Sequence, residues 1–516
     1  MHQKRNHFVT FLLFTSISTI LVFFAILGVL IYFFGHNPLF WIIFLLIHTL
    51  TLIYLAMHMH LNNNYPEYRF FWLFCSILVP WFGFFGYLFS GQIYFLKKKQ
   101  RLWKKISAKY VNFEDQNLKV KLLKHPQLTL DIQKIFRFST QLSPHALYTN
   151  VRLNLLSEPF SKFFQFRIDL EAAQKYIYIN YFIIVNGDCL DFIIDLLITK
   201  LKKGIKVYII YDFIGTIFNS SLSFVWRLKK HGAKFRSFGS VLIGGGEINY
   251  RNHRKDLIID GKIAYTGGYN IGDEYCHMSS VYGVWRDTHV RIEGIAAQSL
   301  ELIFLKDWKM LNRRKIQIRS TTIPRPPPIT SKTFIRNIVQ VVDDGPQIKK
   351  TITRDLLVYL FNSAKKRIWI VTPFFFTDQA FLKTLLNAAL SGVDVRMVLP
   401  SLSYKITIDL MRLPYAKMLD AGIKIYEYKG YLHSKVTIID NDLMTVGTAN
   451  LDYNSFYWAN QTTLLIYDSH LVKQAEKEIF ANDFRHSDLL KSDPLNKSSR
   501  FYLWFLKFIS IIKLFI

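Results

Sequence analysis

At 516 residues, the chain is long enough for two or three domains with sizeable cores. Its composition is 51% hydrophobic with 45 Phe and 28 Tyr, which exceeds what a fully soluble protein needs and indicates that part of it faces lipid. The formal charge of +28 favours an anionic partner, either nucleic acid or an anionic membrane surface. Cys75, Cys189 and Cys276 lack metal-ligand spacing and are too few for a disulfide framework, which favours a reducing compartment.

Three apolar stretches within residues 1–96 predict a membrane anchor. Phe8–Phe34 carries no charge and is long enough to span a bilayer. Leu39–Met57 comes after a short polar break, so the two stretches are expected to form a helical hairpin. The third stretch, Phe70–Leu96, is also uncharged but is interrupted by Pro80, which favours a bent, re-entrant or interfacial segment.

Basic residues on both sides of this anchor conflict over its topology. Lys4 and Arg5 favour a cytoplasmic N-terminus, and the larger basic cluster from Lys97 to Lys105 favours a cytoplasmic location for the remainder of the chain. Three full crossings cannot satisfy both. We therefore expect a multi-pass anchor, a basic juxtamembrane linker over residues 97–130 and a cytoplasmic catalytic domain, and leave two or three crossings open.

The pattern becomes α/β from about residue 130, with the same strand, helix and strand repeated in two halves. The expected elements are Tyr176–Val185, a helix ending at Lys203 and Val207–Tyr211 in one half, and Ile368–Val371, Gln379–Leu390 and Val393–Leu399 in the other.

We expect the halves at 131–312 and 346–490, joined by a linker at 313–345 that contains the proline-rich stretch Arg313–Pro328. The remaining tail, 491–516, is apolar and too short to span comfortably, which favours an interfacial helix over a buried domain helix.

One motif occurs once in each half at identical spacing. In each copy Lys lies two residues after His, Asp seven after, Gly fourteen after and Asn seventeen after. The two copies are His253, Lys255, Asp260, Gly267 and Asn270, and His433, Lys435, Asp440, Gly447 and Asn450.

The spacing has a chemical meaning. His and Lys two apart on a strand share a face, so an imidazole and an ammonium can meet one phosphate. Turn residues at Asp260-Gly261 and Asn441-Asp442 predict a hairpin whose second strand returns Gly and Asn beside the His. The glycine permits close backbone approach, and the Asn amide can donate to a phosphate oxygen. Two copies in register outweigh a structural histidine, and Lys is a poor metal ligand, so no metal site is predicted.

The duplicated His-x-Lys-x4-Asp pattern resembles the phospholipase D superfamily. Its flanks, including Asn249–Lys255, Gly267–Tyr275, Trp285–His289 and Gly422–Tyr428, resemble bacterial cardiolipin synthases over nearly the whole chain. The resemblance implies an α/β fold: a duplicated mixed-sheet sandwich with two pseudo-symmetric halves, preceded by N-terminal transmembrane helices. It also implies a bacterial cell-membrane location.

In such enzymes one histidine attacks the phosphorus of phosphatidylglycerol, forming a phosphohistidine while the other histidine protonates the departing glycerol. The second histidine then deprotonates a hydroxyl of another phosphatidylglycerol, and cardiolipin forms. The resemblance implies phosphatidylglycerol and an anionic membrane as partners, without nucleic acid, metal or cofactor, and leaves a homo-oligomer open. The catalytic candidates are His253, Lys255, Asp260, His433, Lys435 and Asp440, and Asn270 and Asn450 are the phosphate-binding candidates.

The second half departs from the family pattern. Asn454 replaces an expected Arg, and Ala459, Asn460 and Gln461 replace an expected Asn-Phe-Glu. In related enzymes an acid in that region holds the motif histidine. We assign Asp287 to that task for the first motif and expect Gln461 to weaken the second. A nucleophile gains from a carboxylate, so His253 is predicted as nucleophile and His433 as general acid and then base.

Other functions remain open at this point. A phospholipase D-type hydrolase, or a transferase using another alcohol, would have the same catalytic centre. A nuclease of the superfamily would explain the charge but not the membrane segments. A non-catalytic membrane scaffold is disfavoured because His253, Lys255, His433 and Lys435 are all intact.

Overall fold

A computed structural model gives the fold. It describes residues 25, 28–29, 31–62, 66–79, 82–87, 93–110, 122–217, 219–239, 250–278, 284–311, 330–348 and 350–510. Most of the first apolar stretch and the proline-rich stretch Arg313–Pro328 lie outside the described residues. The chain divides into a first unit, residues 1–98 with 240–249, and a second unit, residues 99–239 with 250–516.

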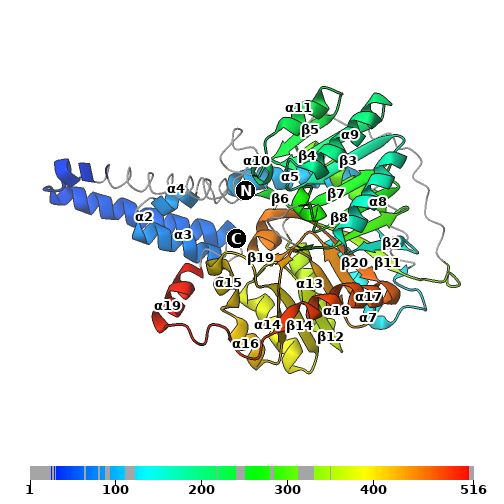
Figure 1. Cartoon of the computed structure of the whole chain (residues 1–516). Helices are drawn as coiled ribbons and strands as arrows, with labels where there is room; N and C mark the ends of the chain where they lie inside the picture. Colours follow the sequence, from blue (N-terminus) through cyan, green and yellow to red (C-terminus); the bar gives the residue numbers. More distant parts are fainter. Residues whose placement is uncertain are drawn as a thin grey trace. The chain divides into compact units, whose positions relative to one another are not determined.

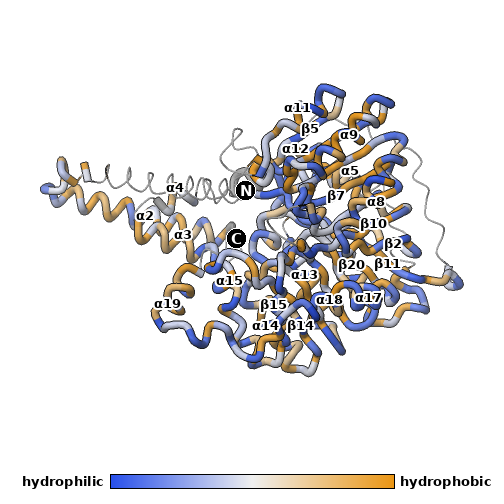
Figure 2. The backbone as a smooth tube through the Cα atoms, viewed as in Figure 1, coloured by the Kyte–Doolittle hydropathy of each residue, from blue (hydrophilic) through white to orange (hydrophobic). Residues whose placement is uncertain are grey.

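The first unit contains α2 (Pro38–Asn62), whose apolar character is visible along its length in Figure 2. Pro38 occupies a position where a missing N–H costs nothing, and Asn37 Oδ1 accepts the N–H of Leu39 at 2.9 Å. Pro38–Leu61 is long and apolar enough to cross a membrane, and it is the one such helix in the described part of the chain. The prediction of a membrane-spanning helix is thus supported for the second apolar stretch.

The third apolar stretch is interrupted as predicted. Helix α3 (Pro66–Leu78) ends two residues before Pro80, and α4 (Phe82–Gly86) lies beyond it. Tyr87 then lies against both earlier helices, with its hydroxyl 3.2 Å from His58 Nδ1 and its ring 6.2 Å from that of Trp72. The chain therefore folds back beyond Pro80, which favours the bent segment over a straight crossing.

The second unit contains two mixed sheets (Figure 1). The first runs β2 (Arg152–Leu156), β10 (His289–Glu293), β8 (Ile263–Gly267), β7 (Lys255–Ile259), β3 (Tyr176–Tyr181), β4 (Lys206–Asp212) and β5 (Lys234–Phe238). The second runs β1 (Leu147–Thr149), β11 (Ile338–Asp344), β20 (Ala459–Tyr467), β18 (Leu443–Gly447), β17 (Val436–Ile439), β12 (Arg367–Val371), β14 (Asp394–Pro400), β15 (Lys424–Tyr428) and β21 (Ser487–Leu489).

The duplication predicted from the motifs is visible in this strand order. β2-β10-β8-β7-β3-β4-β5 matches β11-β20-β18-β17-β12-β14-β15 position by position. In both seven-strand runs the last three strands are parallel, and the remaining pairs are antiparallel. The motif strands β7 and β17 therefore occupy equivalent central positions, as the common spacing requires.

Apolar clusters between and outside the sheets hold the halves together. One cluster joins side chains of both sheets, such as Ile258, Val290 and Met444, with the buried face of α12 (Ala297–Leu311). A second lies under α8 (Pro159–Ala172) and α9 (Asp188–Lys202) on the outer face of the first sheet. A third lies under α13 (Ile352–Ser363) and α14 (Gln379–Leu390). Burial on both faces explains why the strands read as continuous apolar runs.

The predicted start of the first half at residue 131 does not match this packing. Helix α7 (Leu130–Leu142) packs on the core of the second half, where the ring of Phe138 stacks on that of Tyr359 at 4.1 Å. Strand β1 pairs with β11 of the second sheet. The first half therefore begins at β2, and the basic cluster after Lys97 lies on the helix α5 (Ile93–Tyr110).

Candidate active site

The two halves exchange short strands at the motif histidines. β6 (Arg251–Asn252) pairs with the first residues of β20, and β16 (Tyr431–Leu432) pairs with β9 (Trp285–Arg286). The His253 N–H donates to the carbonyl of Asn460 at 3.0 Å, and the His433 N–H donates to that of Arg286 at 2.8 Å. Each histidine is therefore anchored by the backbone of the opposite half.

This exchange decides which side chain holds each imidazole. His433 Nδ1 lies 2.6 Å from Asp287 Oδ2, and His253 Nδ1 lies 3.1 Å from Gln461 Oε1. The prediction that Asp287 orients His253, with Gln461 beside His433, is wrong. Asp287 and Gln461 each come directly after a residue that pairs with the short strand preceding the other half's motif histidine, and each side chain contacts that histidine. The acid expected from related enzymes is therefore missing beside His253 of the first motif, and not beside His433.

The residue fifteen positions after each motif histidine differs between the two halves. It differs together with the side chain beside it, which is Asp287 in one half and Gln461 in the other. In the first half it is Gly268, where a Cβ atom would lie 1.8 Å from Asp287 Oδ1. In the second half it is Thr448, whose hydroxyl donates to Gln461 Oε1 at 2.6 Å. The backbone is the same at both sites, since each N–H donates to the facing strand at 2.8 Å. The Asp287 carboxylate thus lies beside Gly268, and the Gln461 amide lies beside Thr448.

Thr448 also fixes the tautomer of His253. Its Oγ1 accepts the N–H of Thr462 at 2.9 Å, which leaves the hydroxyl proton for Gln461 Oε1. The amide oxygen then faces His253, so Nδ1 must carry the proton that completes this contact. The lone pair of His253 consequently lies on Nε2, where it can act as a nucleophile.

The glycine that lies fourteen residues after each motif histidine allows the close backbone approach that the sequence predicts. A Cβ atom on Gly267 would lie 2.4 Å from the carbonyl of Thr288, and one on Gly447 would lie 2.4 Å from that of Thr462. Only a residue without a side chain lets the two strands meet at this point.

The buried cationic side chains of the site favour the binding of an anion. Lys255 and Lys435 are buried, and each ammonium donates to the carbonyl of its own motif histidine. Burial lowers the pKa of Lys435 to about 7, with partial compensation from Asp287. Burial and then repulsion by Lys435 lower the pKa of Lys255 well below its usual value. A bound phosphodiester would offset these penalties.

The pKa values of both motif histidines are lowered. Burial, then Lys255 and Lys435, hold the pKa of His253 well below its usual value, and burial with Lys435 lowers that of His433 to about 4. Asp287 opposes the shift at His433. Burial alone would raise the pKa of Asp287, but Lys435 and His433 outweigh burial and keep the carboxylate ionised.

Aromatic side chains and the two asparagines complete the surroundings. The ring of Phe182 meets that of His253 at 4.8 Å, and the ring of Trp285 lies 5.8 Å from that of His433. The amide of Asn270 donates to the Tyr275 hydroxyl at 2.8 Å, and that of Asn450 donates to Asp452 at 2.9 Å. Each amide nitrogen has a second proton, so donation to a phosphate oxygen stays a prediction.

Comparison with known proteins agrees with this geometry. A family model described as "Cardiolipin synthase, PLD-like domain" matches residues 167–308 and 357–483. The chain belongs to this cardiolipin synthase family of the phospholipase D superfamily. Cardiolipin synthase 2 of Bacillus cereus is 34% identical over 85% of this chain and 84% of its own length. Cardiolipin synthase of Alkalihalophilus pseudofirmus is 33% identical over 91% and 93%.

A solved structure supports the fold. The phosphatidylserine synthase of Haemophilus influenzae superposes with a TM-score of 0.59 at 15% identity, covering 74% of this chain and 100% of its own. This likeness shows the phospholipase D-like α/β fold, and the cardiolipin synthase relatives identify the chain as a phosphatidyltransferase of that superfamily. Within the described residues, no group of three or more His, Cys, Asp or Glu side chains could hold a metal ion.

The motif aspartates lie outside the site. Asp260 comes directly after β7 and accepts backbone N–H groups of Gln174, Lys175 and Tyr176 at 2.7–2.8 Å. Asp440 does the same after β17, and its carboxylate accepts the N–H of Lys366 at 2.7 Å. At 3.3 Å per residue, each lies about 16 Å along the strand from its motif lysine. Their predicted catalytic role is therefore corrected to that of turn anchors that fix the strand register.

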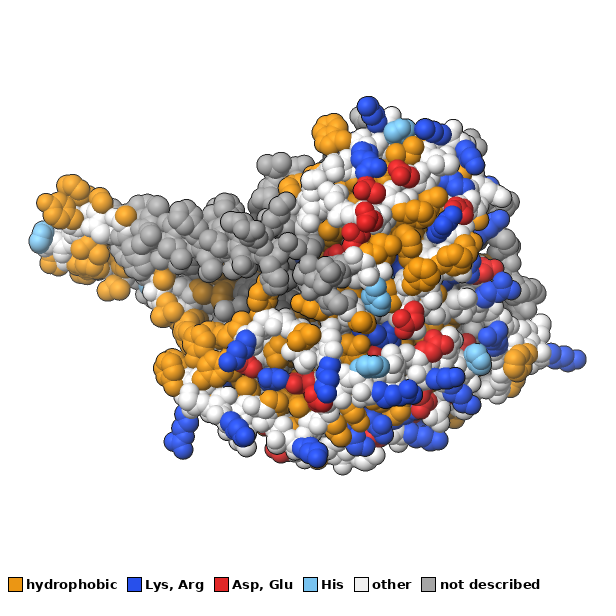
Figure 3. All heavy atoms as spheres, viewed as in Figure 1, with side chains coloured by type: hydrophobic (Ala, Val, Ile, Leu, Met, Phe, Trp, Pro, Cys, Tyr) orange, Lys and Arg blue, Asp and Glu red, His pale blue; other side chains and the backbone are white. Residues whose placement is uncertain are grey.

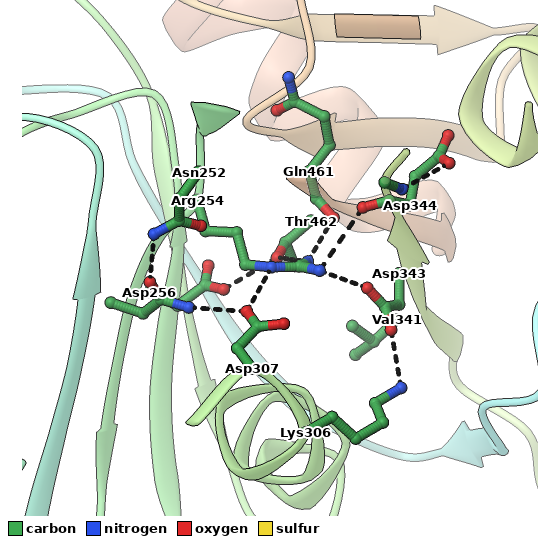
Figure 4. Close-up of polar contacts among 12 residues, drawn as sticks. Asn252, Arg254, Asp256, Lys306, Asp307, Val341, Asp343, Asp344, Gln461 and Thr462 are labelled. Carbon is green, nitrogen blue, oxygen red and sulfur yellow. Dashed lines mark hydrogen bonds and ion pairs between the residues drawn. The ribbon is translucent and has the colours of Figure 1, made fainter. Parts of the chain in front are cut away.

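Figure 4 shows a buried ionic network centred on Arg254, the residue between His253 and Lys255. Its guanidinium donates to Asp307 at 2.9 Å, to Thr462 Oγ1 at 2.9 Å and to the carbonyl of Gln461. It also pairs with Asp343, which Lys306 contacts at 2.7 Å. Because Gln461 and Thr462 belong to the second half, Arg254 links the segment that contains His253 to the strand whose Gln461 contacts that histidine.

Sequence reasoning missed Arg254 and Thr448. Both lie within the motif, and both differ between the copies, with Ser434 in place of Arg254 and Gly268 in place of Thr448. That difference was the available signal, because Ser434 is a short neutral side chain that makes one hydrogen bond to the first half, to Thr288 at 2.8 Å, and cannot form the ion pairs that Arg254 forms. The departures at Ala459 and Asn460 are buried residues whose backbone pairs with β6.

Proposed function

We propose that this chain transfers a phosphatidyl group from one phosphatidylglycerol to another, releasing glycerol and forming cardiolipin through a phosphohistidine. The observation that carries the proposal is the convergence of His253, His433 and two buried lysines where the two halves exchange short strands. The names of the curated relatives support the same product.

The two histidines take different roles because their partners differ. A general acid must be an imidazolium before reaction, and the Asp287 carboxylate stabilises that charge on His433. Binding of the phosphodiester monoanion offsets Lys255 and Lys435, so the pKa values of both rings rise, and His433 takes the proton first. His253, held by the neutral amide of Gln461, stays unprotonated at Nε2. We therefore assign His253 as nucleophile, as the sequence argument did but on the opposite ground, since the carboxylate that argument gave to the nucleophile lies on His433.

The reaction then proceeds in two displacements. Nε2 of His253 bonds to phosphorus as the bond to the glycerol oxygen breaks, and His433 gives that oxygen its proton. The resulting phosphatidyl-histidine is positively charged at the ring, and Gln461 Oε1 accepts its Nδ1–H. Neutral His433 next removes the proton from a hydroxyl of a second phosphatidylglycerol, whose oxygen displaces His253. Lys255 and Lys435 stabilise the equatorial oxygens in both steps.

For the membrane, we propose a multi-pass anchor with the catalytic unit in the cytoplasm. The basic side chains Lys98, Arg101, Lys104 and Lys105 of α5 are exposed or half-exposed and suit the anionic cytoplasmic leaflet. Labelling of an introduced cysteine in the catalytic unit by an impermeant reagent outside intact cells would contradict this orientation.

Product analysis tests the function. Purified full chain is incubated with phosphatidylglycerol in mixed micelles, with a chelator present, and lipid and glycerol products are quantified. We expect cardiolipin and glycerol in equal amounts, and no turnover in the matched control His433→Ala. Phosphatidic acid as the main product would identify a hydrolase instead. Transfer to another supplied alcohol in preference to phosphatidylglycerol would identify a different acceptor.

A further inference from the structure

The C-terminal helix α19 (Arg500–Ile509) is fixed to the catalytic unit by one face. Leu506 is fully buried in the core of the second half, and Tyr502 donates its hydroxyl proton to Asp409 Oδ2 at 2.7 Å. Ser499 caps the helix by accepting the N–H of Tyr502 at 3.2 Å. The helix is therefore a rigid part of the domain surface.

The opposite face of α19 carries a row of exposed aromatic rings. Phe501, Trp504 and Phe508 are 76%, 60% and 53% exposed, although each is large and apolar. Their spacing of three and four residues places them on one stripe. The rings stack along it, with centroids 6.2 Å apart between Phe501 and Trp504 and 5.6 Å apart between Trp504 and Phe508. Figure 3 shows hydrophobic side chains gathered over α19.

A second element extends this surface. Leu402, Tyr404 and Ile406, at the start of α15 (Lys405–Arg412), are 49%, 42% and 39% exposed. Helix α15 packs against α19 through Asp409. We call the exposed side chains of both elements the aromatic face; its members are Leu402, Tyr404, Ile406, Phe501, Trp504, Phe505 and Phe508.

The exposed charges along α19 and the segment just before it have one sign. Residues 494–509 contain no Asp or Glu, whereas Lys497, Arg500 and Lys507 are exposed along the same segment. Lys405 is exposed beside Tyr404 on the neighbouring element. Aromatic rings with basic side chains at their edge are suited to the headgroup region of an anionic bilayer, where rings enter the acyl boundary and ammonium groups meet phosphates. A protein interface would not require a single sign of charge.

We propose that the aromatic face lies in the interfacial layer of an anionic bilayer and gives the catalytic unit a membrane contact of its own, in addition to the α2 anchor. Because Leu506 and Tyr502 fix α19 to the core, this contact orients the whole unit on the surface. The contact is a physical property of the helix and holds whichever alcohol the site uses.

A depth measurement on the full chain tests this. In a Cys75→Ser background, Trp504→Cys is labelled with an environment-sensitive fluorophore and reconstituted into vesicles of phosphatidylcholine and phosphatidylserine, with and without brominated chains. Trp226→Cys is the matched control, since Trp226 is 74% exposed on α11 (Ser223–Lys229). Protein without an introduced cysteine corrects for labelling of Cys189 and Cys276, which are buried.

We expect blue-shifted emission and strong quenching by brominated lipid at position 504, and neither at position 226. Emission at 504 typical of water would overturn the proposal. Blue-shifted emission without lipid quenching would also overturn it, because a second copy or another segment of the chain would then cover the helix.

An activity measurement tests what the membrane contact contributes to turnover. The variant Trp504→Ser/Phe508→Ser should lose about tenfold in turnover on phosphatidylglycerol vesicles, whose surface it must bind, and much less in detergent micelles. Trp226→Ser is expected to match the unmodified chain in both. Equal losses in vesicles and micelles would contradict a membrane role, and circular dichroism of the variant verifies that the fold is retained.

Discussion

The two halves of the catalytic unit repeat one backbone but support their histidines differently. In one crossing contact the Asp287 carboxylate holds His433, and Gly268 leaves room for it. In the other, the Gln461 amide holds His253, and Thr448 orients the amide. We propose that this difference divides the roles of general acid and nucleophile between the two histidines by the charge of the supporting group, with the backbone unchanged.

Removing the carboxylate should have the largest effect on this asymmetry. Asp287→Asn keeps the shape but cannot stabilise an imidazolium at His433, so we expect kcat to fall about 10²- to 10⁴-fold. With a substrate whose leaving group needs no protonation, the first step should recover most of its rate. Equal losses for both substrates would show that Asp287 serves the fold and not the general acid.

Adding a carboxylate on the other side should shift the pH dependence. In Gln461→Glu the new charge stabilises protonated His253 and raises its pKa. The nucleophile must be neutral, so activity should fall at a higher pH on the acidic side, while the alkaline side of the kcat/KM profile stays in place. We expect a loss of about tenfold at pH 6 and a smaller one at pH 8. A gain in activity at all pH values would contradict the need for a neutral support.

The smallest effect is expected from the hydroxyl that orients the amide. Thr448→Val removes the donor to Gln461 Oε1, so the amide can turn and offer its N–H to His253, favouring the wrong tautomer. We expect kcat to fall about 3- to 30-fold with KM nearly unchanged, and Thr448→Ser to restore most of it. Failure of Thr448→Ser to rescue, with normal folding, would assign Thr448 to packing alone.

Much of the site could be predicted because the motif is local. Spacing along one strand and its return strand fixes His253, Lys255, Gly267 and Asn270 relative to one another, and the second copy repeats them. The exchange of Asp287 and Gln461 could not be predicted, because it depends on β6 pairing with β20 and β9 with β16 across the halves. Spacing within one half carries no information about such a crossing.

The fold, like the site, could be predicted only in part. The repeated strand order agrees with the repeated motif, and the interruption near Pro80 results from the chemistry of proline. The placement of α7 and β1 on the second half was missed, because an apolar face does not indicate which core will bury it. Asp260 was predicted both as a turn residue and as a catalytic residue, and the structure agrees with the turn, where its φ is 54°.

The position of the covalent intermediate tests the division of labour most directly. The full chain is mixed with a phosphatidyl substrate carrying an acidic leaving group, quenched with base to preserve phosphohistidine, digested and analysed by mass spectrometry. We predict a phosphatidyl adduct on His253, accumulating further in His433→Ala because nothing deprotonates the acceptor, and none in His253→Ala. An adduct on His433 in the unmodified chain would show that the carboxylate supports the nucleophile and that the roles are reversed.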